Sequence, residues 1–292
     1  MLVIFADTDS DLTPDKAREF GYHLISMPYS HDGKTIYPYE DFDVFESKKF
    51  YNMLRDGTIP TTSAISKERY VDYFEPFFKN GDDILYVHLS EAMTMTIANM
   101  RAAVDELKIK YPERKFYTID TKGITIESLS IVYEVGDLYK AGKTIDEILE
   151  WAKEEVDKFS IYMFADDLKF FKRSGRVSGF SAAMGTLIGV RPIIHINSEG
   201  KMVSIGKERG KKNALNRLLK YVEERGEDVT AHRILIAHSD DEEDAIELAR
   251  MVREKFGEDA KIEIVVANPT AGSHCGPNCL GISFHSIRRD QN

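Results

Sequence analysis

The chain has 292 residues, of which 42% are hydrophobic, so it is long enough to form two domains that each bury a core. Its formal net charge of −10 argues against binding to a nucleic-acid backbone, because proteins that do so present a basic face. No apolar run approaches the ~20 residues of a membrane span, and the first residues lack the basic-then-apolar pattern of a signal peptide, so we expect a cytoplasmic protein without stable membrane insertion.

Strand and helix patterns alternate through the first half of the chain. An apolar run at residues 2–6 precedes an acidic loop, Asp7 to Asp11, and Thr13-Pro14 then begins a short helix that Gly21 ends. Further strands are expected at residues 23–29, 83–89 and 115–119, and helices at 44–54, from Lys67, after Ser90, and in two segments after Gly123, the second opened by a capping box at Thr144. This alternation predicts a parallel sheet with helices on both faces.

After residue 159 the strands follow one another more closely. Three are expected at residues 160–165, 192–197 and 202–206, and Ser198-Glu199-Gly200 joins the last two as a hairpin turn. Later elements are a helix with a basic start (Lys207, Arg209, Lys211, Lys212), strands at 233–238, 261–267 and 282–285, and an acidic helix from Asp240. We therefore predict a domain boundary near residue 160.

Two segments have the composition of anion-binding loops. Residues 172–178 contain Lys172, Arg173 and Arg176 around Gly175, and residues 60–66 contain four hydroxyl side chains. Cations, hydroxyls and free N–H groups at a helix start can hold a carboxylate or phosphate. The same patterns also suit a basic helix C-terminus that ends at glycine, and a serine-threonine turn with a helix cap. Local sequence leaves both interpretations open.

Several separated stretches, taken together, resemble one family. They are Asp7 to Leu12, Pro60 to Ser63, Asp167-Leu168 through Ser178, Lys207 to Arg209, and Ser273 to Pro277. In order and approximate spacing they are similar to the DegV family, the bacterial fatty-acid-binding proteins. The resemblance implies an α/β fold with a Rossmann-like parallel-sheet domain (1–159) and a mixed-sheet α/β domain (160–292).

The resemblance also implies a function. Such a protein is a carrier and not an enzyme: it holds one long-chain fatty acid in a tunnel at the domain junction, without a cofactor, metal or catalytic residue. It presents the carboxylate to an ATP-dependent fatty acid kinase, which forms the acyl phosphate.

Carried over residue by residue, the family's carboxylate-binding positions fall on five side chains. They are Thr61, Thr62, Thr94, Arg176 and His274. The segment from Ser90 to Thr96 departs from the usual Ser-Ser-x-Leu-Ser-Gly-Thr, because Met95 replaces the glycine and Glu91 brings a negative charge close to the expected carboxylate.

Apolar side chains near these motifs are candidates for the walls of the acyl tunnel. They are Met93, Met95, Phe164, Phe180, Met184 and Ile188. Each could equally be plain core, which is where such residues are commonest. Burial of each methylene contributes roughly 0.8 kcal/mol, so the acyl tail would supply affinity while the polar head sets orientation.

Two other functions are compatible with parts of the sequence. His274, Cys275, Cys279 and His285 gather near the C-terminus and could bind a metal, although their spacing is poor for a zinc site. A hydrolase could use Ser63 or Ser273, His274 and one of Asp7, Asp9 or Asp11, although no Gly-x-Ser-x-Gly motif is present.

Overall fold

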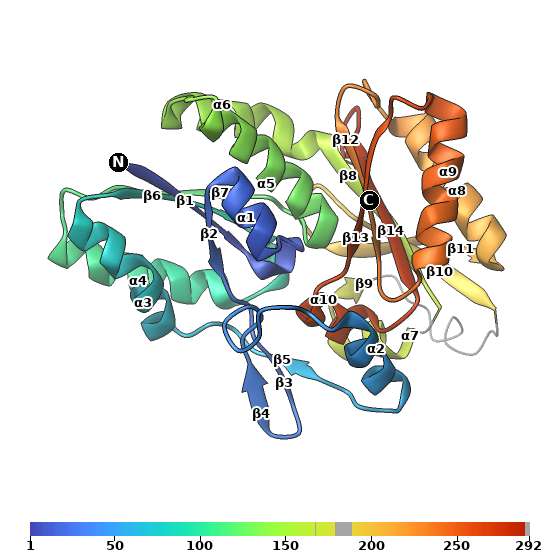
Figure 1. The fold of residues 1–292 in the computed structure, drawn as a ribbon, viewed down its shortest axis with the longest axis horizontal. Helices are drawn as coiled ribbons and strands as arrows, with labels where there is room; N and C mark the ends of the chain where they lie inside the picture. The colour runs from blue at the N-terminus through green and yellow to red at the C-terminus, as the bar shows by residue number, and fades with distance from the viewer. Residues whose placement is uncertain (167, 179–188, 290–292) are drawn as a thin grey trace.

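The chain folds around two main β-sheets with helices between and outside them (Figure 1). The structure is a computed structural model that describes residues 1–166, 168–178 and 189–289. Three predicted tunnel residues, Phe180, Met184 and Ile188, lie outside the described residues. The predicted class, an α/β fold with one parallel and one mixed sheet, is confirmed.

The first sheet is parallel, in the order β2-β1-β6-β7. Its strands are β1 (Leu2–Asp7), β2 (Tyr22–Ile25), β6 (Asp83–His88) and β7 (Phe116–Asp120). On one face, Phe5 and Tyr86 pack against α3 (Lys67–Asn80) and α4 (Thr96–Lys110). On the other, Ile4 and Leu85 pack against α1 (Pro14–Phe20) and α5 (Thr125–Lys140). Both faces are therefore covered, as the alternating pattern predicted.

The predicted helix ends of this half are confirmed by their capping contacts. The hydroxyl of Thr13 accepts a hydrogen bond from the backbone of α1, and Gly21 ends that helix with a positive φ of 83°. Ser66 caps α3, and Thr144 forms a full capping box with Glu147 at the start of α6 (Ile145–Glu155). Such contacts satisfy backbone groups that a helix leaves unpaired at its ends.

The second sheet has seven strands in the order β13-β12-β14-β8-β10-β11-β9 and is mixed. The strands are β8 (Phe159–Ala165), β9 (Val177–Ser178), β10 (Val190–Ile196), β11 (Met202–Arg209), β12 (Arg233–His238), β13 (Lys261–Val266) and β14 (Cys279–His285). The predicted hairpin joins β10 and β11 as an antiparallel pair. Helices α8 (Lys211–Arg225) and α9 (Glu242–Phe256) cover one face, and α5 covers the other.

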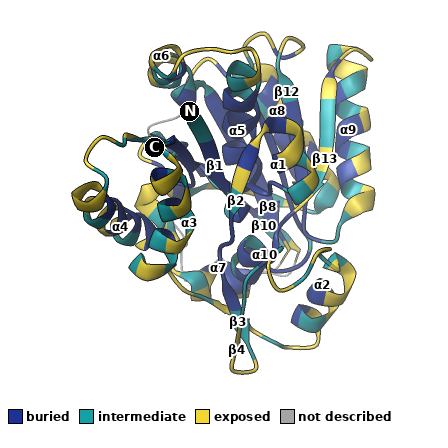
Figure 2. Cartoon of the chain, turned by 60° about the vertical axis from the view of Figure 1, so that its left-hand side comes forward, coloured by how far each residue is buried: buried dark blue, intermediate teal, exposed yellow. Residues whose placement is uncertain are grey.

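Helix α5 lies between the two sheets (Figures 1 and 2). Every residue from Thr125 to Tyr133 is buried. From the parallel sheet, the Tyr22 hydroxyl donates to the Val132 carbonyl, and Ser130 pairs with Ser283 of β14. A helix buried all round is a core element, so α5 joins both sheets into one hydrophobic cluster. The mixed sheet begins with β8 at Phe159, next to the boundary that the sequence predicts near residue 160.

The C-terminal segment is anchored at this junction by Arg289, whose side chain is fully buried. Its guanidinium donates to the carbonyls of Thr121, Lys122, Val156 and Phe159, over 2.7–3.3 Å. The carboxyl group of Glu127, on the first turn of α5, lies 3.4 Å from Nε of Arg289 and is also fully buried. Arg289 therefore ties the loop after β7 to the segment that enters β8.

The structure corrects three local predictions. The strand expected at residues 23–29 divides into β2 and β3 (Tyr29–His31), and β3 belongs to a small sheet with β4 (Lys34–Ile36) and β5 (Thr61–Thr62). The basic residues expected at one helix start are divided between β11, which carries Lys207 and Arg209, and α8. The helices α2 (Ser47–Arg55), α7 (Leu168–Ser174) and α10 (Pro269–Cys275) complete the fold, and α10 was not predicted. Within the described ranges, no helix combines the length and apolarity needed to cross a membrane.

Candidate functional site

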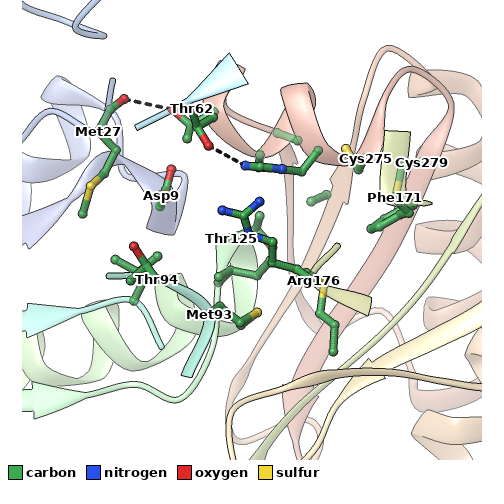
Figure 3. Close-up of a pocket in the computed structure, with 18 of the residues that line it drawn as sticks. Asp9, Met27, Thr62, Met93, Thr94, Thr125, Phe171, Arg176, Cys275 and Cys279 are labelled. Atoms are coloured by element: carbon green, nitrogen blue, oxygen red, sulfur yellow. Dashed lines mark hydrogen bonds between the residues drawn. The ribbon is translucent and has the colours of Figure 1, made fainter. Parts of the chain in front are cut away.

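A cavity of about 280 Å³ lies where the two sheets and α10 meet (Figure 3). Its volume is near the lower end of the roughly 300–1,000 Å³ typical of small-molecule pockets. Polar wall residues include Asp9, Thr62, Ser63, Thr94, Thr96, Thr125, Arg176, His238, Thr270 and His274. Apolar wall residues include Met27, Leu89, Met93, Met95, Ile124, Ile161, Met163, Phe171, Met202, Cys275 and Cys279. In Figure 3, Asp9, Thr62, Thr94 and Arg176 lie to one side of Phe171, Cys275 and Cys279, so the cavity can accommodate an amphipathic molecule.

Thr62 and His274 form a hydrogen-bonded pair in the polar wall. The Thr62 hydroxyl lies 2.9 Å from Nε2 of His274, and joins β5 to α10 (Figure 3). The helix that carries His274 begins at Asn268, whose side chain accepts from the Ala271 N–H. Burial, together with the charges of Arg176 and Arg173, lowers the pKa of His274 to about 4. His274 is therefore neutral at pH 7, so it can donate one hydrogen bond and accept another without adding a charge to the wall.

Arg176 brings a positive charge to the same wall. Gly175, with a φ of 67°, follows the end of α7 and turns the chain so that Arg176 reaches the cavity. Its guanidinium lies among Asp9, Thr62 and Thr94 in Figure 3, while Nη1 also donates to the Ser174 carbonyl at 2.6 Å. In this segment α7 ends at a glycine, and the cation after that glycine lines the cavity.

The two threonines of β5 differ in position, and only Thr62 lines the cavity. Thr61 is exposed and is not part of the cavity wall. Neighbouring residues of a strand point to opposite faces, so the two hydroxyls cannot both face the ligand space. The expectation for Thr61 is thus corrected.

The unusual segment at residues 90–96 supplies part of the cavity mouth. Thr94 lines the wall and accepts a hydrogen bond from the Thr96 N–H at 3.2 Å. Glu91 forms an ion pair with Arg101, which lowers the pKa of its carboxyl, and it does not line the cavity. Met95 lines the wall but is 76% exposed, so it lies at the edge of the opening. The negative charge of Glu91 is therefore directed away from the polar wall.

One face of β8 contributes to the apolar wall. Ile161 and Met163 line the cavity, together with Phe171 and Met202. Phe164 does not: it packs on the opposite face of β8 with Tyr162 and the helices α8 and α9. This placement corrects the prediction for Phe164, and the reason is the two-residue alternation of a strand. Met93 lines the cavity.

Asp9 is a wall residue that the carboxylate-binding prediction did not include. It belongs to the acidic loop after β1, together with Asp7 and Asp11. The flanking carboxylates have structural partners: Asp7 accepts from the Tyr86 hydroxyl and the Leu89 N–H, and Asp11 accepts from the backbone and side chain of Asn268. The sequence placed this loop at a strand end but gave no signal that Asp9 alone would line the cavity.

The structure sets His285 apart from the rest of the candidate metal site, whereas Ser63, His274 and Asp9 of the candidate hydrolase site line one cavity. Nε2 of His285 lies 3.0 Å from Glu155 and Nδ1 lies 3.1 Å from the Glu227 carbonyl, whereas His274 pairs with Thr62. Among the described residues, no group of three or more His, Cys, Asp or Glu side chains could hold a metal ion. Ser273, a hydrolase candidate, is buried and donates to the Pro269 carbonyl.

Comparisons with known proteins identify the family. The family model described as "Uncharacterised protein, DegV family" matches residues 1–286. A DegV domain-containing protein of Clostridium perfringens is 34% identical over 283 residues, which cover 97% of this chain and 96% of that protein.

Solved structures share the fold. A DegV family protein of Ruminococcus gnavus, refined with vaccenic acid, has a TM-score of 0.85 at 19% identity, with 97% of this chain and 99% of that chain covered. A stearic acid-binding protein of Eubacterium ventriosum has a TM-score of 0.85 at 20% identity, with 98% of each chain covered. The family model, the relative in C. perfringens and the common fold together establish that this chain belongs to the DegV family.

Proposed function

We propose that the protein binds a single long-chain fatty acid in this cavity and carries it without chemical change. The observation that supports this proposal is the division of the cavity wall into a polar side, with Thr62, Arg176 and His274, and an apolar side. A carboxylate needs charge-assisted hydrogen bonds when it leaves water, and an acyl chain needs an apolar enclosure. The DegV family protein of R. gnavus was refined with vaccenic acid, and the structurally similar protein of E. ventriosum is described as stearic acid-binding.

In the proposed complex, Arg176 provides the charged donor for the carboxylate. Thr62, Thr94 and His274 provide neutral hydrogen-bonding groups around it. The acyl chain runs along Ile161, Met163 and neighbouring side chains of the apolar wall. With about 0.8 kcal/mol per buried methylene, a long tail gains on the order of 10 kcal/mol before the cost of ordering it.

We further propose that the carboxylate is presented to an ATP-dependent fatty acid kinase, in the cytoplasm where ATP is available. Arg176 and Ser63 are exposed at the polar wall, whereas Ile161 and Met163 on the apolar side are buried. This arrangement leaves the head group next to solvent, where a phosphoryl donor can reach it. An acyl phosphate carries more negative charge than a carboxylate, so Arg176 should matter more for the product than for the substrate.

Native mass spectrometry of the freshly purified protein tests the binding proposal. We expect one excess mass per chain, which denaturation releases and which is identified as a fatty acid. A chain that is empty and takes up no added fatty acid would refute the proposal.

Kinase-dependent phosphorylation of the bound acyl group tests the second step. Arg176→Ala should reduce it at least tenfold, while Lys172→Ala, at an exposed cation outside the cavity wall, should leave it unchanged. Equal phosphorylation rates in both variants would refute the assignment of Arg176 to the carboxylate-binding site.

A further inference from the structure

Thr125, the first residue of α5, is the only threonine of the cavity wall whose hydroxyl has no hydrogen-bond partner among the described residues. The other wall threonines are bonded, in contacts that join Thr62 to His274, Thr94 to Thr96, Thr96 to Ile65, and Thr270 to Met27. A buried hydroxyl without a partner costs free energy, so native structures rarely leave one. The unpaired hydroxyl of Thr125 therefore indicates a partner that the cavity receives from outside.

Thr125 is buried except for a small area that borders the cavity. It is 9% exposed, and the residues that follow it in α5, from Ile126 to Tyr133, are at most 2% exposed. Thr125 and Ile124 both line the cavity, and Figure 3 shows Thr125 among the side chains around it. Both carboxyl oxygens of Glu127 are fully enclosed by the protein, whereas the hydroxyl oxygen of Thr125 is not. The hydroxyl can therefore reach a molecule bound in the cavity.

The backbone at Thr125 is the start of a long helix with free N–H groups. Helix α5 has 16 residues, and no side chain caps its start at Ile124. The N–H groups of Thr125 and Ile126 have no hydrogen-bond partner in the described parts of the chain. Unpaired N–H groups and the helix dipole favour negative charge at such an end. Together with the Thr125 hydroxyl, they are donors suited to an anionic oxygen.

The charges around this helix start also suit an anion. Arg176 brings a positive charge to the same cavity. Glu127, the acidic residue of the first turn, lies against Arg289 and is not part of the cavity wall. Asp9 follows β1 and Thr125 follows β7, and β6 lies between these two strands in the parallel sheet. The acidic wall residue and Thr125 are therefore carried by strands that are not neighbours.

We propose that Thr125 donates a hydrogen bond from its hydroxyl to an oxygen of the ligand's anionic head group, at the start of α5. This inference rests on the proposed fatty-acid binding and adds a residue that the family resemblance does not supply. A hydrogen bond to a charged acceptor is stronger than one between neutral groups, so the contact contributes to affinity as well as orientation.

The same contact is available to both forms of the proposed ligand. When the terminal phosphoryl group of ATP is transferred to the carboxylate, one P–O bond forms and another breaks, ADP leaves, and no proton is taken up or released. The carboxylate offers two oxygens to the wall, and the phosphoryl group of the product offers three with more charge. Thr125 can therefore bind an oxygen of the free acid, of the acyl phosphate, or of both.

Thr125→Val and Thr125→Ser form a matched pair that separates the hydrogen bond from packing. Valine keeps the shape of threonine and removes the donor, whereas serine keeps the donor and removes the methyl group. Isothermal titration calorimetry measures the affinity for hexadecanoate and for hexadecyl phosphate, each kept below its aggregation concentration. We expect Thr125→Val to lose about tenfold or more with at least one probe, and Thr125→Ser to stay within about threefold of the natural protein.

Thr118→Val is the control for a loss of a threonine hydroxyl elsewhere. Thr118 is an exposed residue of β7 outside the cavity wall, so both affinities should be unchanged. Urea unfolding shows whether each variant is folded. If Thr125→Val does not fold, Thr125→Ala removes the same hydroxyl without a β-branched side chain at the φ of 49° that Thr125 adopts.

The two probes separate the possible outcomes. A loss with hexadecyl phosphate alone assigns the contact to the product, and a loss with hexadecanoate assigns it to the free acid. Unchanged affinity of Thr125→Val for both probes would refute the contact and leave the proposed function intact. A weaker Thr125→Ser beside an unchanged Thr125→Val would show that Thr125 only packs. Absence of hexadecanoate binding in the natural protein would refute the proposed function itself.

Discussion

Replacement of Arg289 by methionine should destabilise the protein strongly, although the residue lies near the end of the chain. Methionine fills much of the same volume but leaves four carbonyl groups, of Thr121, Lys122, Val156 and Phe159, without their donor. A buried polar group left unpaired costs roughly 1–3 kcal/mol. Water can reach some of these carbonyls in the variant, so we expect a total loss of about 3–5 kcal/mol, less than four full penalties.

Urea unfolding, followed by fluorescence, measures this loss. Trp151 is the only tryptophan, and its ring lies 6.4 Å from that of Phe159, next to one of the four carbonyls. The midpoint should fall without a change in the denaturant slope. Arg288→Met at the exposed neighbouring position is the control and should stay within about 0.5 kcal/mol of the natural protein. A loss below about 1 kcal/mol in Arg289→Met would refute the anchoring role.

Three further predictions concern pH and the cavity wall. Burial raises the pKa of Glu127 to about 8, so its stabilising contribution is present below its ordinary pKa of 4.5 and is lost as pH rises through 8. Glu127→Gln should remove this loss. In urea unfolding, the free energy of unfolding of the variant should therefore gain a few kcal/mol relative to that of the natural protein between pH 5 and pH 9. The pKa of His274 is lowered to about 4, so its contribution to stability is present above pH 6.5 and is lost as pH falls through 4. Between pH 7 and pH 4, the free energy of unfolding of His274→Gln should therefore fall by about 3 kcal/mol less than that of the natural protein, as measured from the unfolding midpoints at the two pH values. Met163→Trp should shift the bound mass in native mass spectrometry to that of shorter acyl chains. Phe164→Trp, on the other face of β8, should lower stability and leave the bound mass unchanged. The same bound lipid in both variants would contradict the assignment of the two faces.

Elements fixed by local chemistry could be predicted from the sequence. The helix starts at Thr13, Ser66 and Thr144 have capping side chains within four residues, and the structure contains those contacts. Strand β12 has the predicted bounds, because its apolar run stands between clear polar boundaries. The convergence of Thr62, Arg176 and His274 on one cavity followed from family resemblance and not from local pattern.

Features that depend on tertiary contacts could not be predicted. Every residue of β8 is buried, so its sequence has no polar alternation to show that Met163 faces the cavity and Phe164 faces α8. The division of β2 from β3 depends on the pairing of β3 with β5, which lies about thirty residues further along the chain. The burial of Arg289 could not be predicted from the sequence either, because a basic residue near a chain end is usually solvated.

The position of α5 has a consequence for how this molecule unfolds. Two sheets in one chain would ordinarily allow two separate transitions, one for each domain. Here the sheets pack against opposite sides of the same helix, so separation of either sheet exposes apolar surface on α5 that the other sheet cannot cover. Each half keeps a cluster of its own on the face away from α5, but loses the cluster that the two sheets share. We therefore expect a single cooperative transition, in which the parallel and the mixed sheet lose their amide-exchange protection together.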